Sequence, residues 1–397
     1  MNQPQLNINN SNENLCEIIR QHICNSPKQR ITFAEYMDLV LYHPQHGYYA
    51  TDPVNIGKQG DFLTSPHWGA DFGELLAEQF VQMWDILNRS DDFTIVEMGA
   101  GQGILAEQIL EHLKQQHFDF FQIIEYVIIE KSEVLKEAQK QRLNSYQVKW
   151  CDWEEISNSS ITGCFFSNEL VDAFPVHQIR VENRQIREIY VTSDSDGKFG
   201  EITDEISTPR ISEYFNLVGI DLLADAYPDG YQSEVNLHGL NWIKTVADKL
   251  LKGYVLTIDY GYLAPRYYNP IRKQGTLQCY YHHHRNNDPY WNIGRQDITA
   301  HVDFTALEKQ GNLSGLENLG LTRQALFLMA LGLGDKLNEL SNNQEFSLQE
   351  ILRRREALHS LIDPMGLGDF GVLVQSKSLS EEEKKQTLKG LSMPPMG

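Results

Sequence analysis

The residues best suited to hold a ligand form the segment VEMGAGQG at residues 96–103. Its glycines, Gly99, Gly101 and Gly103, follow a short apolar run and precede a helical pattern. Gly99 allows a sharp turn, and Gly101 lets the backbone come close to a bound molecule. Backbone N–H groups at the start of the helix can then face carboxylate or hydroxyl oxygens. The segment therefore predicts a cofactor-binding turn between a strand and a helix.

The details of this segment separate several kinds of cofactor. A dinucleotide fingerprint would place its third glycine where Ile104 stands, and a P-loop would continue with Gly-Lys-Ser/Thr, which is absent. Glu97 ends the preceding strand, and the pattern E-x-G-x-G-x-G resembles motif I of class I methyltransferases. A carboxylate there suits the cationic amino group of S-adenosylmethionine and would repel a pyrophosphate. We therefore expect S-adenosylmethionine as the cofactor.

Two later strands also end in acidic residues. Glu130 ends YVIIE, where its carboxylate could accept hydrogen bonds from both ribose hydroxyls. Asp152 ends QVKWCD, where it could accept the adenine amino group while the ring of Trp153 packs on the base. Three acids in the right strand order, together with the glycines, favour S-adenosylmethionine; the alternative is a Rossmann-like domain without such a ligand.

The elements around these residues alternate between strand and helix. Such alternation indicates a parallel sheet with right-handed crossovers. We predict an α/β, Rossmann-like class I methyltransferase fold, with a mostly parallel seven-stranded sheet, an N-terminal helical segment and an inserted cap. The expected strands are 94–98, 126–130, 147–152, 164–169, 254–261 and 370–377, and the expected helices are 33–43, 70–87, 104–116, 132–142, 209–224, 237–252, 298–309, 322–340 and 347–361.

The predicted organisation is one domain with additions. We expect a flexible N-terminus over 1–30, with a short helix from Leu15 to His22. A helical, cofactor-proximal segment follows over 31–90, in which Thr32 and Glu35 form a capping box. The methyltransferase domain spans 91–377, with antiparallel strands in a cap at about 176–236. Residues 262–296 read as a loop, and 378–397 as a charged tail.

Composition excludes several classes of protein. The formal net charge of −20 repels phosphate backbones, so we expect no nucleic-acid partner, although a basic partner would be tolerated. No apolar run approaches the roughly 18 residues that span a bilayer, so we expect no membrane insertion. The polar first 30 residues resemble neither a secretory signal nor a transit peptide, which predicts a cytoplasmic location.

The cysteines and histidines of the sequence form no recognisable metal-binding motif. The five cysteines include no C-x-x-C pair, which argues against a disulfide framework and a structural zinc site. The run His282, His283, His284 could bind a metal, but adjacent side chains rarely converge, so we interpret it as a polar loop. We expect no metal.

Several longer segments together resemble the MidA family, also called DUF185, of class I methyltransferases. The resemblance extends from about residue 30 to residue 377. The segments that carry it are FAEYMDLVLYHPQHGYY (33–49), GDFLTSP (60–66), VEMGAGQG (96–103), SNELVDAFPVH (167–177), IDYG (258–261) and DITAHVDF (297–304).

The resemblance implies a Rossmann-like core with a cap, S-adenosylmethionine as methyl donor and S-adenosylhomocysteine as product. For the mitochondrial member of the family, the resemblance implies symmetric arginine methylation of a subunit of the respiratory NADH dehydrogenase. For this chain we therefore expect a protein substrate, such as a subunit of a respiratory or NDH-type complex. Two alternatives stay open: O- or N-methylation of a small molecule, and a non-catalytic assembly factor that binds S-adenosylmethionine. The oligomeric state also stays open, with a dimer as one alternative.

The strand CFFSNE supplies the candidates for catalysis, because ligands of open α/β sheets bind at the carboxyl ends of strands. A carboxylate could hold a guanidinium bidentately and take up its proton as a new bond forms. We assign this role to Glu169, with Asn168 holding the cofactor or the substrate through its amide. Asp172 is a further candidate, with an alternative role as the cap of the next segment.

Two other segments offer polar groups to this site. The segment GDFLTSP resembles the family's cofactor-proximal loop, and its candidate residues are Gly60, Asp61, Thr64 and Ser65. The alternative is that Thr64 or Ser65 caps the helix expected near residue 70. His301, with Asp303 nearby, could shuttle a proton from the helix 298–309, although a histidine on an amphipathic helix is often structural. Tyr48 and Tyr49 could line a substrate entrance or pack in the core.

Overall fold

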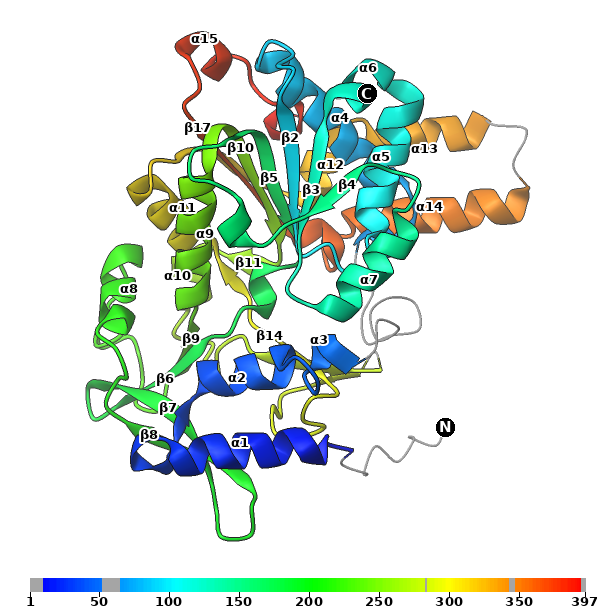
Figure 1. Ribbon diagram of the computed structural model, residues 1–397. Coiled ribbons are helices and arrows are strands. Elements are labelled where there is room, and N and C mark those ends of the chain that lie inside the picture. Colours follow the sequence, from blue (N-terminus) through cyan, green and yellow to red (C-terminus); the bar gives the residue numbers. More distant parts are fainter. Residues whose placement is uncertain (1–9, 52–64, 283, 343–346, 394–397) are drawn as a thin grey trace. The chain divides into compact units, whose positions relative to one another are not determined.

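The chain forms two compact units, each assembled from separate stretches of sequence. The computed structural model describes residues 10–51, 65–282, 284–342 and 347–393 (Figure 1). Unit 1 comprises Met1–Phe62, Ala173–Gly239 and Leu263–His301. Unit 2 comprises Leu63–Asp172, Leu240–Tyr262 and Val302–Gly397. Among the described residues, no helix has the length and apolar character needed to cross a membrane.

Unit 2 is built on a seven-stranded sheet. The strands in sheet order are β16 (Glu317–Arg323), β17 (Gly371–Lys377), β10 (Leu250–Asp259), β5 (Ile161–Asn168), β2 (Phe93–Met98), β3 (Glu125–Ile129) and β4 (Val148–Trp150). Strand β17 is antiparallel to both neighbours, and the pairs from β10 to β4 are all parallel. This arrangement confirms the predicted mostly parallel, Rossmann-like α/β fold.

The apolar runs in the sequence become strands that are buried on both faces. Phe166 of β5 and Leu256 of β10 face a core that also contains Leu76 and Phe80 of α4 (Asp71–Ile86). Their neighbours Phe165 and Val255 point to the opposite face and are equally buried. Parallel sheets with both faces covered have such continuous apolar strands. The sheet therefore provides a rigid platform for the residues at its strand ends.

The helices of unit 2 mostly follow the strands in alternation. Besides α4 they are α5 (Ile104–Gln116), α6 (Phe118–Ile123), α7 (Glu133–Arg142), α9 (Leu237–Lys249, which begins in unit 1), α11 (Phe304–Leu313), α12 (Gln324–Ala330), α13 (Leu333–Asn342), α14 (Leu348–Ile362) and α15 (Glu381–Lys384).

Unit 1 combines helices with two antiparallel sheets. The larger sheet contains β1 (Ile31–Thr32), β6 (His177–Glu182), β7 (Gln185–Ser193), β8 (Phe199–Asp204) and β9 (Gln232–Val235). The smaller contains β12 (Gln278–Tyr281), β13 (His284–Asn286) and β14 (Asp297–Thr299). The helices are α1 (Glu13–Asn25), α2 (Phe33–Tyr42), α3 (Tyr48–Thr51), α8 (Arg210–Val218) and α10 (Ala264–Tyr267).

Helix α2 begins as its sequence predicts. The Thr32 hydroxyl accepts from the backbone N–H of Glu35 at 3.1 Å, and the Glu35 carboxylate accepts from the backbone N–H of Thr32 at 2.7 Å. This capping box satisfies two backbone donors that a helix start otherwise leaves unpaired. Tyr48 is buried in the core of unit 1, and Tyr49 donates to Asp297 at 3.1 Å. Both tyrosines therefore have packing roles in unit 1.

The two ends of the chain differ from the prediction of a flexible segment and a charged tail. Within 1–30, residues Glu13–Asn25 form α1, because Leu15 and Ile19 lie on one face and are buried in the core of unit 1. Within 378–397, Leu379 and Leu388 are buried in the core of unit 2. The short helix expected from Leu15 to His22 is therefore present within α1, whereas the burial of Leu379 and Leu388 was not expected.

Some predicted elements are also corrected. The expected loop 262–296 contains α10, β12 and β13, and the polar, glycine-containing segment 317–323 forms strand β16. The helix expected over 322–340 is two helices, α12 and α13, with Gly332 between them at a φ of +108°. That backbone conformation is accessible to glycine and interrupts a helix.

Candidate active site

Several of the candidate residues lie where the strand order of unit 2 reverses. Strand β2 lies between β5 and β3, and the chain leaves it toward β3 before returning to β5 on the other side. In open α/β sheets, ligands bind at the carboxyl ends of the strands where the strand order reverses in this way. The glycine segment follows β2, and Asn168 and Glu169 stand at the end of β5.

The glycine segment adopts the conformation that its composition predicts. Gly99, Gly101 and Gly103 have φ values of +71°, +52° and +74°, in the left-handed region. The Gly99 N–H donates to the Ile129 carbonyl of β3 at 3.0 Å, which anchors the turn to the sheet. No atom lies within 4 Å of the position that a Cβ on Gly101 would occupy. The backbone at Gly101 is thus open to a ligand.

Glu97 is a buried acid directly below this turn. Its side chain is almost fully buried, and its Oε2 accepts a hydrogen bond from the Tyr126 hydroxyl at 2.7 Å. Burial raises the pKa of Glu97 to about 7, although the Tyr126 hydrogen bond opposes the shift; the charge of Glu130 adds to it. A cationic group placed beside Glu97 would favour the ionised carboxylate.

Glu130 is held in place by a residue that sequence reasoning missed. Its carboxylate accepts from the Ser132 N–H at 2.9 Å and from the Gln139 side chain at 3.1 Å. The same Gln139 nitrogen donates to the Gly101 carbonyl at 2.8 Å, and the Gln139 oxygen accepts from the Trp150 indole at 3.0 Å. Gln139 therefore ties the glycine segment to the ends of β3 and β4.

Asp152 and Trp153 follow β4 in a different setting. The Asp152 side chain is 63% exposed, with Lys136 at 3.4 Å. The Asp152 N–H donates to the Glu155 carboxylate at 2.7 Å, which begins the short 3-10 helix Trp153–Glu155. The Trp153 ring stacks on Phe165 of β5, with centroids 6.2 Å apart and planes at 16°. Contact of these residues with adenine stays a prediction.

Glu169 occupies a strained position at the end of β5. Its φ of +53° is in the left-handed region, where a residue other than glycine costs about 1 kcal/mol or more. Its N–H donates to the Ile258 carbonyl of β10 at 2.9 Å. Its Oε1 accepts from the Asn168 amide at 3.1 Å and from the Ser65 N–H at 3.4 Å. The neighbouring strand thus holds Glu169 in this conformation.

Asn168 keeps one polar atom without a partner. Its Oδ1 is buried and accepts no hydrogen bond from any residue that the structure describes, while its amide nitrogen is used by Glu169. Buried acceptors normally have a donor. A bound molecule that supplies an N–H or O–H group would complete this pair of side chains.

Asp259 joins Glu169 and Asp172 in an acidic cluster that sequence reasoning left unassigned. One Asp259 oxygen accepts from the backbone N–H groups of Val171 at 2.9 Å and Asp172 at 3.3 Å, and the other accepts from that of Tyr260 at 2.9 Å. Full burial raises the pKa of Asp259 well above its usual range, and the charges of Asp172 and Glu169 raise it further. An acid ending the apolar run YVLTID was the available signal.

The other predicted segments contribute unequally. Gly60, Asp61 and Thr64 lie outside the described residues. Ser65 is buried in the 3-10 helix Ser65–Trp68, and its hydroxyl lies 3.4 Å from the Gln324 side-chain oxygen. Helix α4 starts after Ala70 without a side-chain cap, so Ser65 belongs beside Glu169 and does not cap that helix.

The prediction that His301 lies on a helix is wrong. Helix α11 starts at Phe304, because the Asp303 carboxylate accepts from the N–H groups of Thr305 and Ala306 at 3.0 and 3.3 Å. His301 instead follows β14 in unit 1, where its N–H donates to the Thr276 hydroxyl at 3.1 Å. Burial lowers its pKa to about 4, with smaller effects of arginine charges, chiefly Arg272. The imidazole is therefore neutral at pH 7 and weakly basic.

Taken together, the described residues fit S-adenosylmethionine. The open backbone at Gly101, the buried acids Glu97 and Glu130, and the unpaired Oδ1 of Asn168 supply the shape and the acceptors for an amino acid and a ribose. Glu169 and Asp172 add negative charge beside the buried acid Asp259, whose pKa these charges raise. Carboxylates of this kind recognise cations and accept protons.

Protein-family models and curated proteins show which proteins this chain resembles. The family model described as "Putative S-adenosyl-L-methionine-dependent methyltransferase" matches residues 75–322. The mitochondrial "Protein arginine methyltransferase NDUFAF7 homolog" of Drosophila melanogaster is 29% identical over 372 residues, covering 85% of this chain and 79% of its own. The human mitochondrial "Protein arginine methyltransferase NDUFAF7" is 27% identical over 369 residues, covering 85% and 78%.

Two solved structures resemble the whole chain. A "likely methyl transferase" from Burkholderia thailandensis, bound to S-adenosyl-homocysteine, is 30% identical with a TM-score of 0.84, covering 96% of this chain and 95% of its own. A COG1565 superfamily protein from the same organism, whose native crystal structure is known, shares 30% sequence identity with this chain. The TM-score is 0.80, and the match covers 95% of this chain and 94% of that protein. The similarity extends over both units of the chain.

Proposed function

This chain belongs to the family of S-adenosylmethionine-dependent methyltransferases whose model it matches, and we propose that it methylates arginine side chains of a protein. The observation that carries the proposal is the acidic cluster of Glu169, Asp172 and Asp259 at the ends of β5 and β10. The relatives named as protein arginine methyltransferases support the same substrate class.

The acidic cluster suits a guanidinium better than a neutral acceptor. Three carboxylates at adjoining strand ends repel one another, and this repulsion adds to the burial that raises the pKa of Asp259. A cation with several N–H donors removes the repulsion and pairs with two oxygens of one carboxylate. Arginine is the protein side chain with this geometry. The site is thus arranged to bind arginine through its charge.

The chain's residues would position the acceptor and manage its proton. When bound, S-adenosylmethionine supplies an activated methyl group on a sulfonium. Glu169 would hold the guanidinium so that one nitrogen points at the methyl carbon, since correct alignment lowers the barrier of a displacement. Glu169 would accept the proton that the attacking nitrogen loses when the methyl group moves to it from sulfur. Asn168 would keep Glu169 oriented through its amide.

Small-molecule methylation depends on a different base and has less support. His301 is a candidate base for that alternative, and its pKa is lowered to about 4 by burial and by the charges of nearby arginines. An imidazole with this pKa is a poor proton acceptor at neutral pH, because basicity falls with pKa. The acidic cluster has no evident use in such a reaction. A respiratory or NDH-type complex subunit as substrate, and a cytoplasmic location, remain predictions.

The proposal is tested by following a labelled methyl group. The purified full chain is incubated with methyl-tritiated S-adenosylmethionine and a cell extract from which free small molecules have been removed. We expect the label in protein, and acid hydrolysis should release it as methylarginine. Label in methyl-lysine or another residue, or only in small molecules when these are restored, would overturn the arginine assignment. The absence of any transfer, with intact S-adenosylhomocysteine binding, would favour the assembly-factor alternative.

A further inference from the structure

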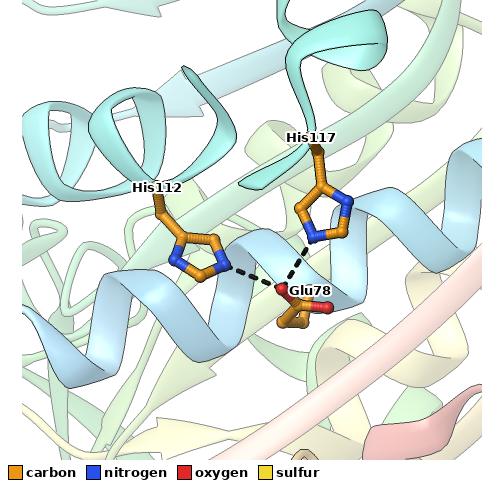
Figure 2. A group of neighbouring side chains, drawn as sticks. All are labelled: Glu78, His112 and His117. Atoms are coloured by element: carbon orange, nitrogen blue, oxygen red, sulfur yellow. Dashed lines mark hydrogen bonds and ion pairs between the residues drawn. The ribbon is translucent and has the colours of Figure 1, made fainter. Parts of the chain in front are cut away.

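A second group of side chains with metal-binding chemistry lies in unit 2. It consists of Glu78, His112 and His117, which we call the Glu78 cluster (Figure 2). Their ligand atoms all lie within 4.8 Å of one another, and the described part of the chain contains no other group of three such side chains. The proposed methyl transfer makes no use of these residues, so their convergence has a separate cause.

The side chains of the Glu78 cluster point to a common centre. The Glu78 Oε1 lies 2.7 Å from the His112 Nε2 and 2.8 Å from the His117 Nε2. The two imidazole rings approach from different directions, with centroids 5.9 Å apart and planes at 50° (Figure 2). The side chains of His112, His117 and Glu78 are 15%, 26% and 31% exposed. The centre is therefore partly sheltered but accessible from solvent.

Helix packing fixes this arrangement. Glu78 comes from the middle of α4, His112 from the last turns of α5, and His117 is the residue that ends α5. The two helices approach closely at Gly73, where a Cβ would lie only 2.5 Å from the Cβ of Gln108. About one turn further along both helices, the same packing sets Glu78 opposite His112. The backbone thus places the ligands before any ion binds.

We propose that the Glu78 cluster binds a divalent transition-metal ion of the zinc type. Two imidazole nitrogens and one carboxylate oxygen form a zinc ligand set that leaves a fourth position to water. Mg²⁺ and Ca²⁺ prefer sites made of oxygen ligands. Bonds of about 2.0–2.1 Å at tetrahedral angles separate ligand atoms by roughly 3.3 Å, so each present contact has to widen by about half an ångström. Side-chain rotation can supply this movement.

The ion would stabilise the fold and would take no part in methyl transfer. Helix α5 begins beside the glycine segment and returns along the sheet, and His112 lies eight residues, or about 12 Å, from its start at Ile104. The Glu78 cluster therefore lies toward the amino-terminal ends of the parallel strands. Cofactors of open α/β sheets bind at the opposite, carboxyl ends of the strands. The ion would join α4 to the end of α5.

The test measures metal content and stability of the full chain prepared without a histidine tag. After chelation and dialysis, the protein is equilibrated with Zn²⁺ and analysed by mass spectrometry for bound metal. We expect one Zn²⁺ per chain. A free Zn²⁺ concentration 100 times the Kd should raise the Tm by about 3 °C. Co²⁺ should give the visible absorption of a four-coordinate site, and Mg²⁺ should have no effect.

Variants separate this site from adventitious binding. His112→Ala and Glu78→Gln should lose the ion and the Tm increase, while still binding S-adenosylhomocysteine, which shows that they fold. The control carries His282→Ala and His284→Ala and should keep one Zn²⁺. Equal binding by His112→Ala and the parent chain, loss of binding in the His282/His284 control, or no binding by the parent would each overturn the proposal. In the last case the Glu78 cluster is a hydrogen-bonded link between helices.

Discussion

At the scale of single residues, Glu169 combines a strained backbone with a reactive position. A φ of +53° costs about 1–3 kcal/mol for such a residue, so the surrounding structure must hold it there. The Ile258 carbonyl, the Asn168 amide and the Ser65 N–H supply that restraint. Strain of this kind concentrates at functional sites, which is consistent with a role for Glu169 in contact with the substrate.

Replacing Glu169 by Gln tests that role. The substitution keeps the side-chain length and removes the proton acceptor, so we expect kcat for methyl transfer to fall at least about 100-fold. The Kd for S-adenosylhomocysteine should stay within about threefold, as measured by calorimetry. Glu137→Gln, an exposed substitution on α7, serves as the control. Near-normal turnover of the Glu169 variant would remove this residue from the mechanism.

Glu97 gives a prediction about pH. Its folded pKa of about 7 lies above the usual value of 4.5, so the folded chain holds an extra proton between these values. The stability contributed by the neutral acid is complete below pH 4.5 and is lost as the pH rises through 7. A cationic amino group needs the ionised form, so S-adenosylmethionine should bind roughly five- to tenfold more weakly at pH 6 than at pH 7.5.

Two variants check the assignment of this pH dependence. Tyr126→Phe removes the hydrogen bond that lowers the pKa of Glu97, so the loss of affinity should begin at a higher pH. Glu97→Gln should bind weakly at every pH in this range. Calorimetric titrations of the parent chain that give one affinity from pH 6 to 7.5 would mean that Glu97 does not change its protonation on binding.

At the scale of elements, the glycine segment forms a turn whose backbone is open to a ligand at Gly101. Gly101 and Gly219 share a positive φ, +52° and +74°, and neither has an atom within 4 Å of the position of a Cβ. Gly219 ends α8 in unit 1, far along the chain from the cofactor motif. Alanine would therefore meet a similar backbone strain at either position, but only Gly101 lies in the cofactor motif.

Alanine at each glycine separates these effects. Either substitution should lower the free energy of unfolding by about 1 kcal/mol, because alanine is strained at positive φ. Gly101→Ala should also weaken S-adenosylhomocysteine binding at least about tenfold, since the new methyl group occupies the space for the ligand. Gly219→Ala should leave that affinity unchanged. Equal affinities for both variants would place the cofactor away from Gly101.

The sequence predicts the elements whose signals are local. The glycine segment, the capping box at Thr32 and Glu35, and the strand ends at Glu97 and Glu130 depend on neighbouring residues, and the structure forms each of them. What could not be predicted depends on contacts between distant segments. Gln139 looks like an ordinary residue on a polar helix until it meets Glu130, Gly101 and Trp150.

The same reason explains the other omissions. The Glu78 cluster unites residues that are 34 and 39 positions apart, and only helix packing reveals their convergence. Asp259 lay within the predicted strand 254–261, but its role becomes visible only when β10 pairs with β5 and brings it to Glu169 and Asp172. Strand β16 has a polar, glycine-containing sequence that pairing with β17 alone makes extended.

At the scale of the whole molecule, net charge should influence how a substrate arrives. A chain with a formal charge of −20 attracts basic segments and repels acidic ones. For a basic arginine-containing peptide we expect KM to rise several-fold between 50 and 300 mM salt, with kcat unchanged, because screening slows association. A neutral arginine peptide is the control. A salt-independent KM for both peptides would show that overall charge has no part in recognition.

The position of β17 has a consequence for the synthesis of the chain. This strand comes from residues 371–377 near the end of the sequence, yet it lies between β10 and β16 inside the sheet. Until a ribosome has released it, β10 and β16 each present unpaired backbone groups along an open edge, and such edges invite aggregation. A nonsense codon before residue 371 would therefore remove an interior strand, and the truncated product should be cleared by proteolysis even though its cofactor motif is complete.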